Sequence, residues 1–268
     1  MKKTTLTLVM ICSIIFNLTA CMNVSSSNGL FGKSIKGNGV HKEQERGKMD
    51  FSGIDVRGSV DVIIADIGDA AVKVSGDENL LEHIETYVKN GVLNIHFKDG
   101  YRYTSKKGIK VTVPDNGRLN SIKASGSSDV LTEGVIVPDN IIINCKGSSD
   151  FKGSIKAERC ELIFSGSSDF KGSVEAETFI VKCSGSSDCV INGKADICEI
   201  SMSGSSDFKG YDFIVNKLNC NTSGSSDIQI TCNEELSVRA SGSSDVYYKG
   251  DAKVLSAHTS GSSDLIRK

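Results

Sequence analysis

The sequence predicts an all-β protein built as a parallel β-helix, or β-solenoid, with coils of about 19 residues. Three observations support this fold class. The tetrapeptide Gly-Ser-Ser-Asp occurs eight times in the second half of the chain, at intervals of 18 to 21 residues. Apolar residues recur at fixed distances from each motif, and the chain contains only 2 prolines. The motifs begin at Gly126, Gly147, Gly166, Gly185, Gly204, Gly224, Gly242 and Gly261.

The eight repeats share three apolar columns, which lie four and two residues before the glycine and four residues after it. Because the columns have matching parity, an extended strand places them on one face. The opposite parity is polar, since the residue before the glycine is Ser in seven copies and Lys146 in the other. Each repeat is therefore expected to form one coil with an apolar interior. The column after the glycine comprises Val130, Phe151, Phe170, Cys189, Phe208, Ile228, Val246 and Leu265.

A ninth, degenerate copy begins at Gly58, where the motif reads Gly-Ser-Val-Asp. Val60 replaces the second serine, which indicates that the second serine of every motif faces inward. The first serine and the aspartate are then expected to face outward. Residues 65–118 are an insertion or a differently wound β region. Within them, Asp77 to Val88 is the one segment that predicts a helix, because apolar residues recur at helical spacing behind a capping aspartate.

Four segments follow from this organisation. Residues 1–20 are a lipoprotein signal peptide, and residues 21–48, rich in Ser, Gly, Lys and Asn, are a flexible tether. Residues 49–118 form an N-terminal β region with one short helix. Residues 119–268 form the β-solenoid of eight repeats.

The first residues of the chain indicate export and lipid attachment. Two lysines precede an apolar stretch from Leu6 to Phe16, which is too short for an ordinary transmembrane helix. The following Leu18-Thr-Ala-Cys21 resembles the lipobox of bacterial lipoproteins, which implies cleavage before Cys21 and acylation of that cysteine. An ordinary signal peptide with a chance cysteine is the alternative. Because Met22 and Asn23 replace the aspartate that commonly retains lipoproteins at an inner membrane, we expect an outer-membrane lipoprotein.

Charge and cysteine content exclude some classes of partner and cross-link. Removal of residues 1–20 changes the net charge from −2 to −4, so neither nucleic acid nor an anionic membrane surface is an expected partner. Seven of the 9 cysteines lie after Cys21, and six of these fall in apolar columns. Cysteines of one column are separated by an intervening coil, beyond disulfide reach. We expect buried free thiols, with disulfides as the alternative.

The repeated aspartates are interpreted as a structural ladder on the outside of the solenoid. Like charges about 5 Å apart repel by roughly 1 kcal/mol in a water-like dielectric, so some groups must offset them. Lysines two residues after Asp150, Asp169 and Asp207 are expected to pair with these three carboxylates. Calcium binding, and ice or glycan binding by the ladder, are the alternatives. The ladder comprises Asp129, Asp150, Asp169, Asp188, Asp207, Asp227, Asp245 and Asp264.

Enzyme signatures are absent from the sequence, and no catalytic residue, metal site or cofactor is predicted. The histidines at 41, 83, 96 and 258 are isolated, and none has metal-ligand spacing to a Cys or another His. The chain has no nucleophile elbow and no phosphate-binding glycine loop. An acid repeated in every coil is more typical of a scaffold than of a catalyst.

Several segments together resemble the head GIN domain family of auto-transporter adhesins, which is common among envelope lipoproteins of Bacteroides-type bacteria. The resemblance covers residues 37–268. It implies a right-handed β-helix anchored at the cell envelope, without catalytic residues. Besides the serial turns, it depends on Phe51-Ser-Gly-Ile54-Asp-Val56, Gly58-Ser-Val-Asp-Val62, Gly76-Asp-Glu-Asn79-Leu80-Leu81 leading to Ile84, Asn90-Gly-Val-Leu93-Asn-Ile95 and Ile109-Lys-Val-Thr-Val113-Pro114.

The first functional hypothesis is a non-enzymatic envelope lipoprotein whose solenoid is a binding or structural surface, with a glycan or a protein as its ligand. The alternatives are a carbohydrate-active β-helix enzyme and a calcium-dependent binding module. The last motif is followed only by Leu265-Ile-Arg-Lys268, which predicts an open coil edge. Either the two terminal basic residues block this edge, or a second copy of the chain covers it.

Overall fold

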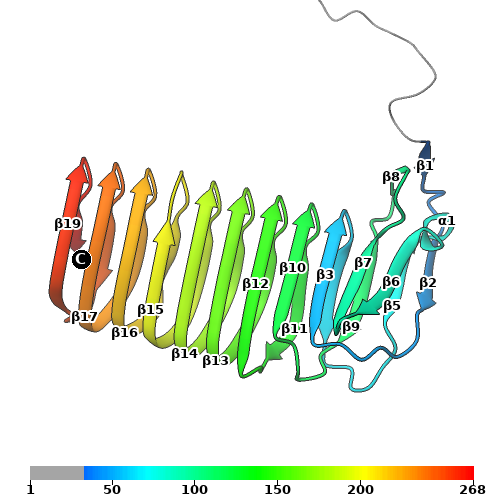
Figure 1. Ribbon diagram of the computed structural model, residues 1–268, viewed down its shortest axis with the longest axis horizontal. Helices are drawn as coiled ribbons and strands as arrows, with labels where there is room; N and C mark the ends of the chain where they lie inside the picture. The colour runs from blue at the N-terminus through cyan, green and yellow to red at the C-terminus, as the bar shows by residue number, and fades with distance from the viewer. Residues whose placement is uncertain (1–32) are drawn as a thin grey trace, which may run out of the picture. The chain divides into compact units, whose positions relative to one another are not determined.

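The structure, a computed structural model, describes residues 33–268 and confirms the all-β solenoid with one short helix. The predicted signal peptide and lipid-attachment residue Cys21 lie outside the described residues. Within the described part of the chain, 18 strands belong to one hydrogen-bonded sheet that winds into coils, and β1 pairs with β8 separately. Figure 1 shows the coils side by side from β3 to β19, with their tight turns in a row along one edge.

The N-terminal region and the repeats have the following elements. The N-terminal region contains β1 (Ser34–Lys36), β2 (His41–Glu45), β3 (Gly53–Gly58), β4 (Asp61–Ala65), β5 (Lys73–Asp77), α1 (Glu78–Leu81), β6 (Ile84–Lys89), β7 (Val92–Phe97), β8 (Arg102–Thr104) and β9 (Lys110–Pro114). The repeats contain β10 (Ser121–Gly126), β11 (Val130–Ile136), β12 (Asn140–Gly147), β13 (Phe151–Gly166), β14 (Phe170–Gly185), β15 (Cys189–Met202), β16 (Phe208–Gly224), β17 (Ile228–Gly242), β18 (Val246–Lys249), β19 (Lys253–Gly261) and β20 (Leu265–Arg267).

Successive repeats pair in parallel and in register. Strands β13 and β14, for example, pair from Phe151 with Phe170 to Gly166 with Gly185. Side chains at equal repeat positions therefore stack on one another, as the apolar columns require. The rings of Phe151 and Phe170 show this stacking, with centroids 5.8 Å apart and planes within 3°.

The three predicted columns form the core between the two faces of the solenoid. Their members are buried in the first seven repeats. In the last repeat Ala257 and Thr259 are exposed and Leu265 is half-buried, because β19 and β20 have a described neighbour on one side only. The core is therefore continuous along the repeats and uncovered at β19.

The degenerate copy at Gly58 is confirmed as part of the same stack. Strand β3 pairs with β10 so that Gly58 lies opposite Gly126, and β4 pairs with β11. The parallel stack continues one coil further, because β7 pairs with β3 and β9 pairs with β4. Residues 92–114 thus supply a further coil beneath the degenerate one.

Beyond this coil both faces change to antiparallel pairing. Strand β6 pairs with β7 on one face, while β5 pairs with β9 and β2 pairs with β5 on the other. The edge strand β2 reads His-Lys-Glu-Gln-Glu, and all five residues are exposed. Charged side chains on an edge strand oppose pairing with another sheet.

The predicted helix from Asp77 to Val88 is wrong in its extent, because α1 ends at Leu81. Leu80, Leu81 and Ile84 are buried as the helical spacing required, but Ile84 already begins β6. The Asn90-Gly91 pair has positive φ at both residues and closes a two-residue hairpin to β7. This turn holds residues 84–89 in a strand and leaves Val88 exposed.

Two strands also lie within residues 21–48, the segment assigned to a flexible tether. Strand β1 pairs with β8, and β2 pairs with β5. The part of this segment from Ser34 onward is therefore folded against the N-terminal region.

The expected helix cap, Asp77, instead ties three segments together. Its buried carboxylate makes no capping bond. It accepts hydrogen bonds from the Gly39 amide at 2.7 Å, the Ser105 hydroxyl at 2.5 Å and the amides of Lys106 and Lys107. Burial alone would raise the pKa of Asp77, but these bonds outweigh it and lower the pKa to about 2.

We predict that Asp77→Ala lowers the free energy of unfolding by about 3 kcal/mol, because it leaves several donors without an acceptor. Since the pKa of Asp77 is lowered on folding, its contribution is complete above about pH 4 and is lost as the pH falls towards 2. Urea unfolding at several pH values measures both effects. Asp69→Ala, at an exposed site, is the control. An equal loss at pH 7 and pH 2.5 would contradict this role.

Candidate functional site

Each Gly-Ser-Ser-Asp motif forms a tight turn that depends on glycine. At Gly185, for example, φ is +87°, a conformation that costs L-residues roughly 1–2 kcal/mol. A Cβ atom at this position would lie 2.5 Å from the carbonyl oxygen of Gly166 in the preceding coil. The glycine thus permits both the turn and the close approach of neighbouring coils.

The second serine of each motif is buried, as predicted. Its hydroxyl oxygen accepts a hydrogen bond from the amide of the second serine in the preceding coil. Ser168 donates to Ser187 Oγ at 3.3 Å, and Ser187 donates to Ser206 Oγ at 3.1 Å. The ladder comprises Ser128, Ser149, Ser168, Ser187, Ser206, Ser226, Ser244 and Ser263.

The aspartates form a second ladder, whose hydrogen bonds run in the opposite direction. Each aspartate amide donates to the Oδ1 atom of the aspartate in the preceding coil, at 2.8–3.2 Å. Asp61 of the degenerate copy accepts the first of these bonds. Half-exposed or exposed carboxylates extend along the turns at Asp129, Asp150, Asp169, Asp188, Asp207, Asp227, Asp245 and Asp264.

The opposite directions explain the sequence of the degenerate copy. A serine is needed at this position only where the preceding coil has a turn amide that requires an acceptor. The coil that precedes Val60 has no such turn, since Lys110 rather than a turn aspartate lies opposite Asp61. Val60 still donates its own amide to Ser128 Oγ at 3.2 Å. Asp61 is retained because it must accept the amide of Asp129.

The expected lysine pairs form at only one of three positions. Lys209 Nζ lies 2.6 Å from Asp188 Oδ2 and 3.4 Å from Asp207 Oδ2, so it bridges two neighbouring coils. Lys152 and Lys171 form no ion pair within 4.0 Å in the described chain, which corrects the prediction for Asp150 and Asp169. At these coils the aspartates are stabilised by turn amides rather than by lysine.

Incomplete neutralisation is reflected in the pKa values of two ladder residues. Burial raises the pKa of Asp61 and of Asp150, and neighbouring carboxylates raise both further. The amide bonds from the following coil act in the opposite direction, and Lys110 also favours ionised Asp61. At Asp61 and Asp150 the turn amides therefore offset the cost of the ionised carboxylate only partly.

A groove of about 470 Å³ follows the ladder from Asp61 to Asp188 on the post-turn face. Five aspartates line it, and Ile63, Leu131 and Val190 contribute apolar surface. Lys152 and Lys171 also line this groove. Within residues 33–268 no group of three or more His, Cys, Asp or Glu side chains is placed to hold a metal ion.

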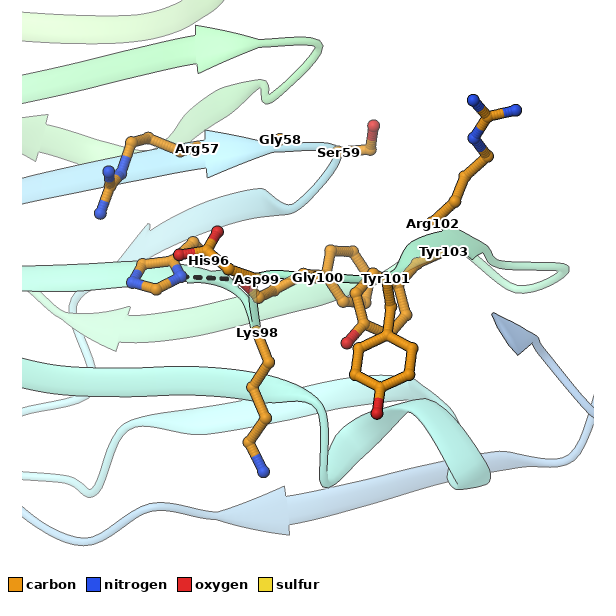
Figure 2. A pocket seen from close by; sticks show the side chains of 11 residues that line it. Arg57, Gly58, Ser59, His96, Lys98, Asp99, Gly100, Tyr101, Arg102 and Tyr103 are labelled. Carbon is orange, nitrogen blue, oxygen red and sulfur yellow. Dashed lines mark hydrogen bonds between the residues drawn. The ribbon is translucent and has the colours of Figure 1, made fainter. Parts of the chain in front are cut away.

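A second pocket, of about 410 Å³, lies at the degenerate copy and outside the eight Gly-Ser-Ser-Asp repeats. Figure 2 shows it between the end of β3, Arg57 to Ser59, and the segment from His96 to Tyr103. The parallel pairing of β3 with β7 brings these segments together. It contains none of the sequence-predicted ladder residues.

Aromatic rings form one wall of this pocket. Phe97 and Tyr103 are stacked with centroids 4.3 Å apart, and His83 packs 5.4 Å from Tyr103. Tyr101 lies 6.0 Å from both Tyr103 and His83, and it remains 47% exposed. Burial raises the pKa of Tyr103, whose hydroxyl has no hydrogen-bond partner in the described chain. We call Phe97, Tyr101, Tyr103 and His83 the aromatic cluster.

Seven cysteines lie in the described chain, and all seven are buried free thiols. This confirms the preference for thiols over disulfides. Burial raises the pKa of Cys145, Cys160, Cys183 and Cys220 to about 12, so these groups stay protonated. They act as small apolar side chains in the core.

A model of one protein family matches residues 50–252 of the chain. The family is described as "Putative auto-transporter adhesin, head GIN domain". The match includes the N-terminal region from β3 onward, with the degenerate copy, and most of the repeats. No curated protein is similar enough to count as a relative.

Three solved structures share the fold. A putative adhesin from Parabacteroides distasonis has a TM-score of 0.81 and 22% identity, over 88% of this chain and 100% of that one. A putative adhesin from Parabacteroides merdae has a TM-score of 0.79 and 20% identity, over 88% and 99%. A putative lipid binding protein from Parabacteroides distasonis has a TM-score of 0.76 and 22% identity, over 88% and 100%.

We predict that Ser206→Ala lowers the free energy of unfolding by about 1–3 kcal/mol, because the buried amide of Ser187 loses its acceptor. Ser205→Ala is the matched control, since this exposed neighbour is expected to change stability by less than about 0.5 kcal/mol. Denaturant midpoints compare the two variants. Equal midpoints for both would show that the serine ladder adds no stability.

We predict that Asp150→Asn retains the oxygen that accepts the Asp169 amide and raises the melting temperature at pH 7. Because folding raises the pKa of Asp150, its ionised form costs stability at neutral pH. The cost decreases as the pH falls through the raised pKa and is gone below the ordinary value of 3.8. The variant's advantage should therefore vanish in acid. Thermal unfolding at pH 7 and pH 3 measures it, with exposed Asp66→Asn as the control. A lower melting temperature at pH 7 is the opposite outcome.

Proposed function

Because this chain belongs to the family described as "Putative auto-transporter adhesin, head GIN domain", we propose that it is a non-enzymatic, lipid-anchored protein of the cell envelope. Its solenoid presents a rigid binding surface in the manner of an adhesin. The lipid holds the protein at the outer membrane, and the ligand is a glycan or a protein outside the chain.

The observation that carries this proposal is that the repeated polar side chains hold the scaffold together. The second serines and the aspartates both satisfy turn amides of neighbouring coils. Groups committed to holding a backbone together are poor candidates for acid–base chemistry, which needs them free to reach a substrate. A regular scaffold with binding residues added outside the repeat fits an adhesin better than an enzyme.

Membrane attachment in this proposal depends on the lipobox-like Leu18-Thr-Ala-Cys21. No helix among residues 33–268 is long and apolar enough to cross a membrane. Two or more acyl chains give stable anchoring without a spanning helix. The folded domain begins within about a dozen residues of Cys21, which keeps it close to the membrane surface.

A carbohydrate-active enzyme is the second candidate, and one observation favours it. The groove beside the ladder places Asp150 and Asp169 near Lys152 and Lys171, which form no ion pairs in the described chain. An acid and a base side by side are what cleavage of an acidic polysaccharide would need. Loss of chain length from polygalacturonate incubated with the protein would support this candidate over the adhesin.

We predict that Cys21→Ser abolishes lipid labelling and moves the protein from the detergent phase to the aqueous phase after detergent phase separation. The reason is that the acylated thiol supplies the membrane affinity. Cells fed a radiolabelled fatty acid test the first effect. Cys12→Ser, within the signal peptide, is the matched control and should remain labelled. A wild-type protein without label would contradict lipid anchoring.

A further inference from the structure

We propose that the pocket beside the aromatic cluster binds a neutral pyranose ring of a glycan. This inference rests on the proposed role as a binding protein, and it assigns the ligand class and the place of binding. The pocket lies between Arg57–Ser59 and His96–Tyr103 (Figure 2). Its volume of about 410 Å³ falls in the range of roughly 300–1,000 Å³ that is typical of small-molecule sites.

The first argument is the exposed ring of Tyr101. Tyr101 is 47% exposed to solvent, whereas Tyr103 and Phe97 are less exposed. Tyr103 and His83 pack against Tyr101 from within the cluster, with centroids 6.0 Å away. A held aromatic ring with a free face provides apolar contact area at a small entropic cost. The apolar C–H face of a pyranose is the complement to such a ring.

The second argument is the mixture of donors and acceptors among the residues that line the pocket. Sugar hydroxyls both donate and accept hydrogen bonds, so a sugar site needs both kinds of partner. The Arg57 guanidinium, half exposed and only 3.7 Å from Asp55, can donate, and the exposed carboxylate of Asp99 can accept. The exposed hydroxyl of Ser59 can do both.

The third argument is rigidity. His96, which lines the pocket, is held by a 2.8 Å hydrogen bond between Nδ1 and the carbonyl oxygen of Phe97, drawn in Figure 2. On the other side, Arg57 is held by the register of β3 with β10, in which it lies opposite Ser125. Because neither side of the pocket is a long free loop, little order must be gained on binding.

Charge favours a neutral sugar over an anionic ligand. The pocket lining contains the acidic residue Asp99 as well as basic residues, and Arg57 lies near the carboxylate of Asp55. The side chains of Lys98 and Arg102 point to opposite sides in Figure 2. A site for phosphate or a carboxylate would bring several cations onto one point. This arrangement does not, so the polar groups are better matched to hydroxyls.

The test uses the full chain with Cys21→Ser, coupled to beads so that weak single-site binding is amplified by multivalency. The probes are a printed array of neutral glucose-, galactose- and mannose-containing oligosaccharides and a matched set of sialylated and uronic acid oligosaccharides. We expect binding to at least one neutral probe. Tyr101→Ala should reduce that binding at least tenfold, whereas Tyr101→Phe should stay within twofold because the ring is retained.

Tyr247→Ala at the other end of the repeats is the matched control and should bind like the parent protein. Melting temperatures show that all variants are folded. Binding that survives Tyr101→Ala would overturn the pocket assignment while leaving the adhesin role intact, and binding to acidic probes alone would overturn the neutral assignment. Absence of binding to every array probe overturns the glycan inference, and adhesion of the same beads to whole cells would then retain the proposed adhesin role.

Discussion

The coils of this solenoid depend on one another for the hydrogen bonds of their tight turns. A turn of four residues cannot satisfy its own amides, and an unpaired buried amide costs about 1–3 kcal/mol. Here the amide of the second serine donates forward to the next coil, and the amide of the aspartate donates back to the preceding one. This constraint requires glycine for close approach, a hydroxyl inside and a carboxylate outside at nearly every turn.

The same constraint explains why a row of like charges is tolerated. Each aspartate oxygen accepts an amide of the following coil, which offsets part of the repulsion between neighbouring carboxylates. Lys209 contributes at one point by bridging Asp188 and Asp207. The repeated motif therefore serves to stack the coils. The pocket beside Tyr101 arises where the repeat pattern is interrupted.

Much of the solenoid could be predicted because each coil repeats one pattern. The alternation of apolar and polar positions along each repeat located the core, and Val60 alone indicated which serine faces inward. Other features could not be predicted from spacing. Leu80, Leu81 and Ile84 satisfy helical spacing, but the Asn90-Gly91 hairpin places Ile84 in a strand. That dipeptide is the signal that would have corrected the helix.

The aromatic pocket was missed for a different reason. Its two sides lie about 40 residues apart and meet only through the pairing of β3 with β7. The chain has no Trp and only 6 Tyr, so composition does not predict an aromatic site. Likewise, spacing along one strand predicts the contact of Lys209 with Asp207, but it does not predict the shorter contact of Lys209 with Asp188 in the preceding coil.

Hydrogen exchange at the turn amides tests the central claim most directly. Although the turns lie at the edge of the solenoid, the ladders predict that the amides of Ser187 and Asp188 exchange as slowly as that of Cys189 in the adjoining strand. Exchange as rapid as that of the exposed Gly117 turn would contradict the account, because it would mean that coil-to-coil bonds do not hold the turns.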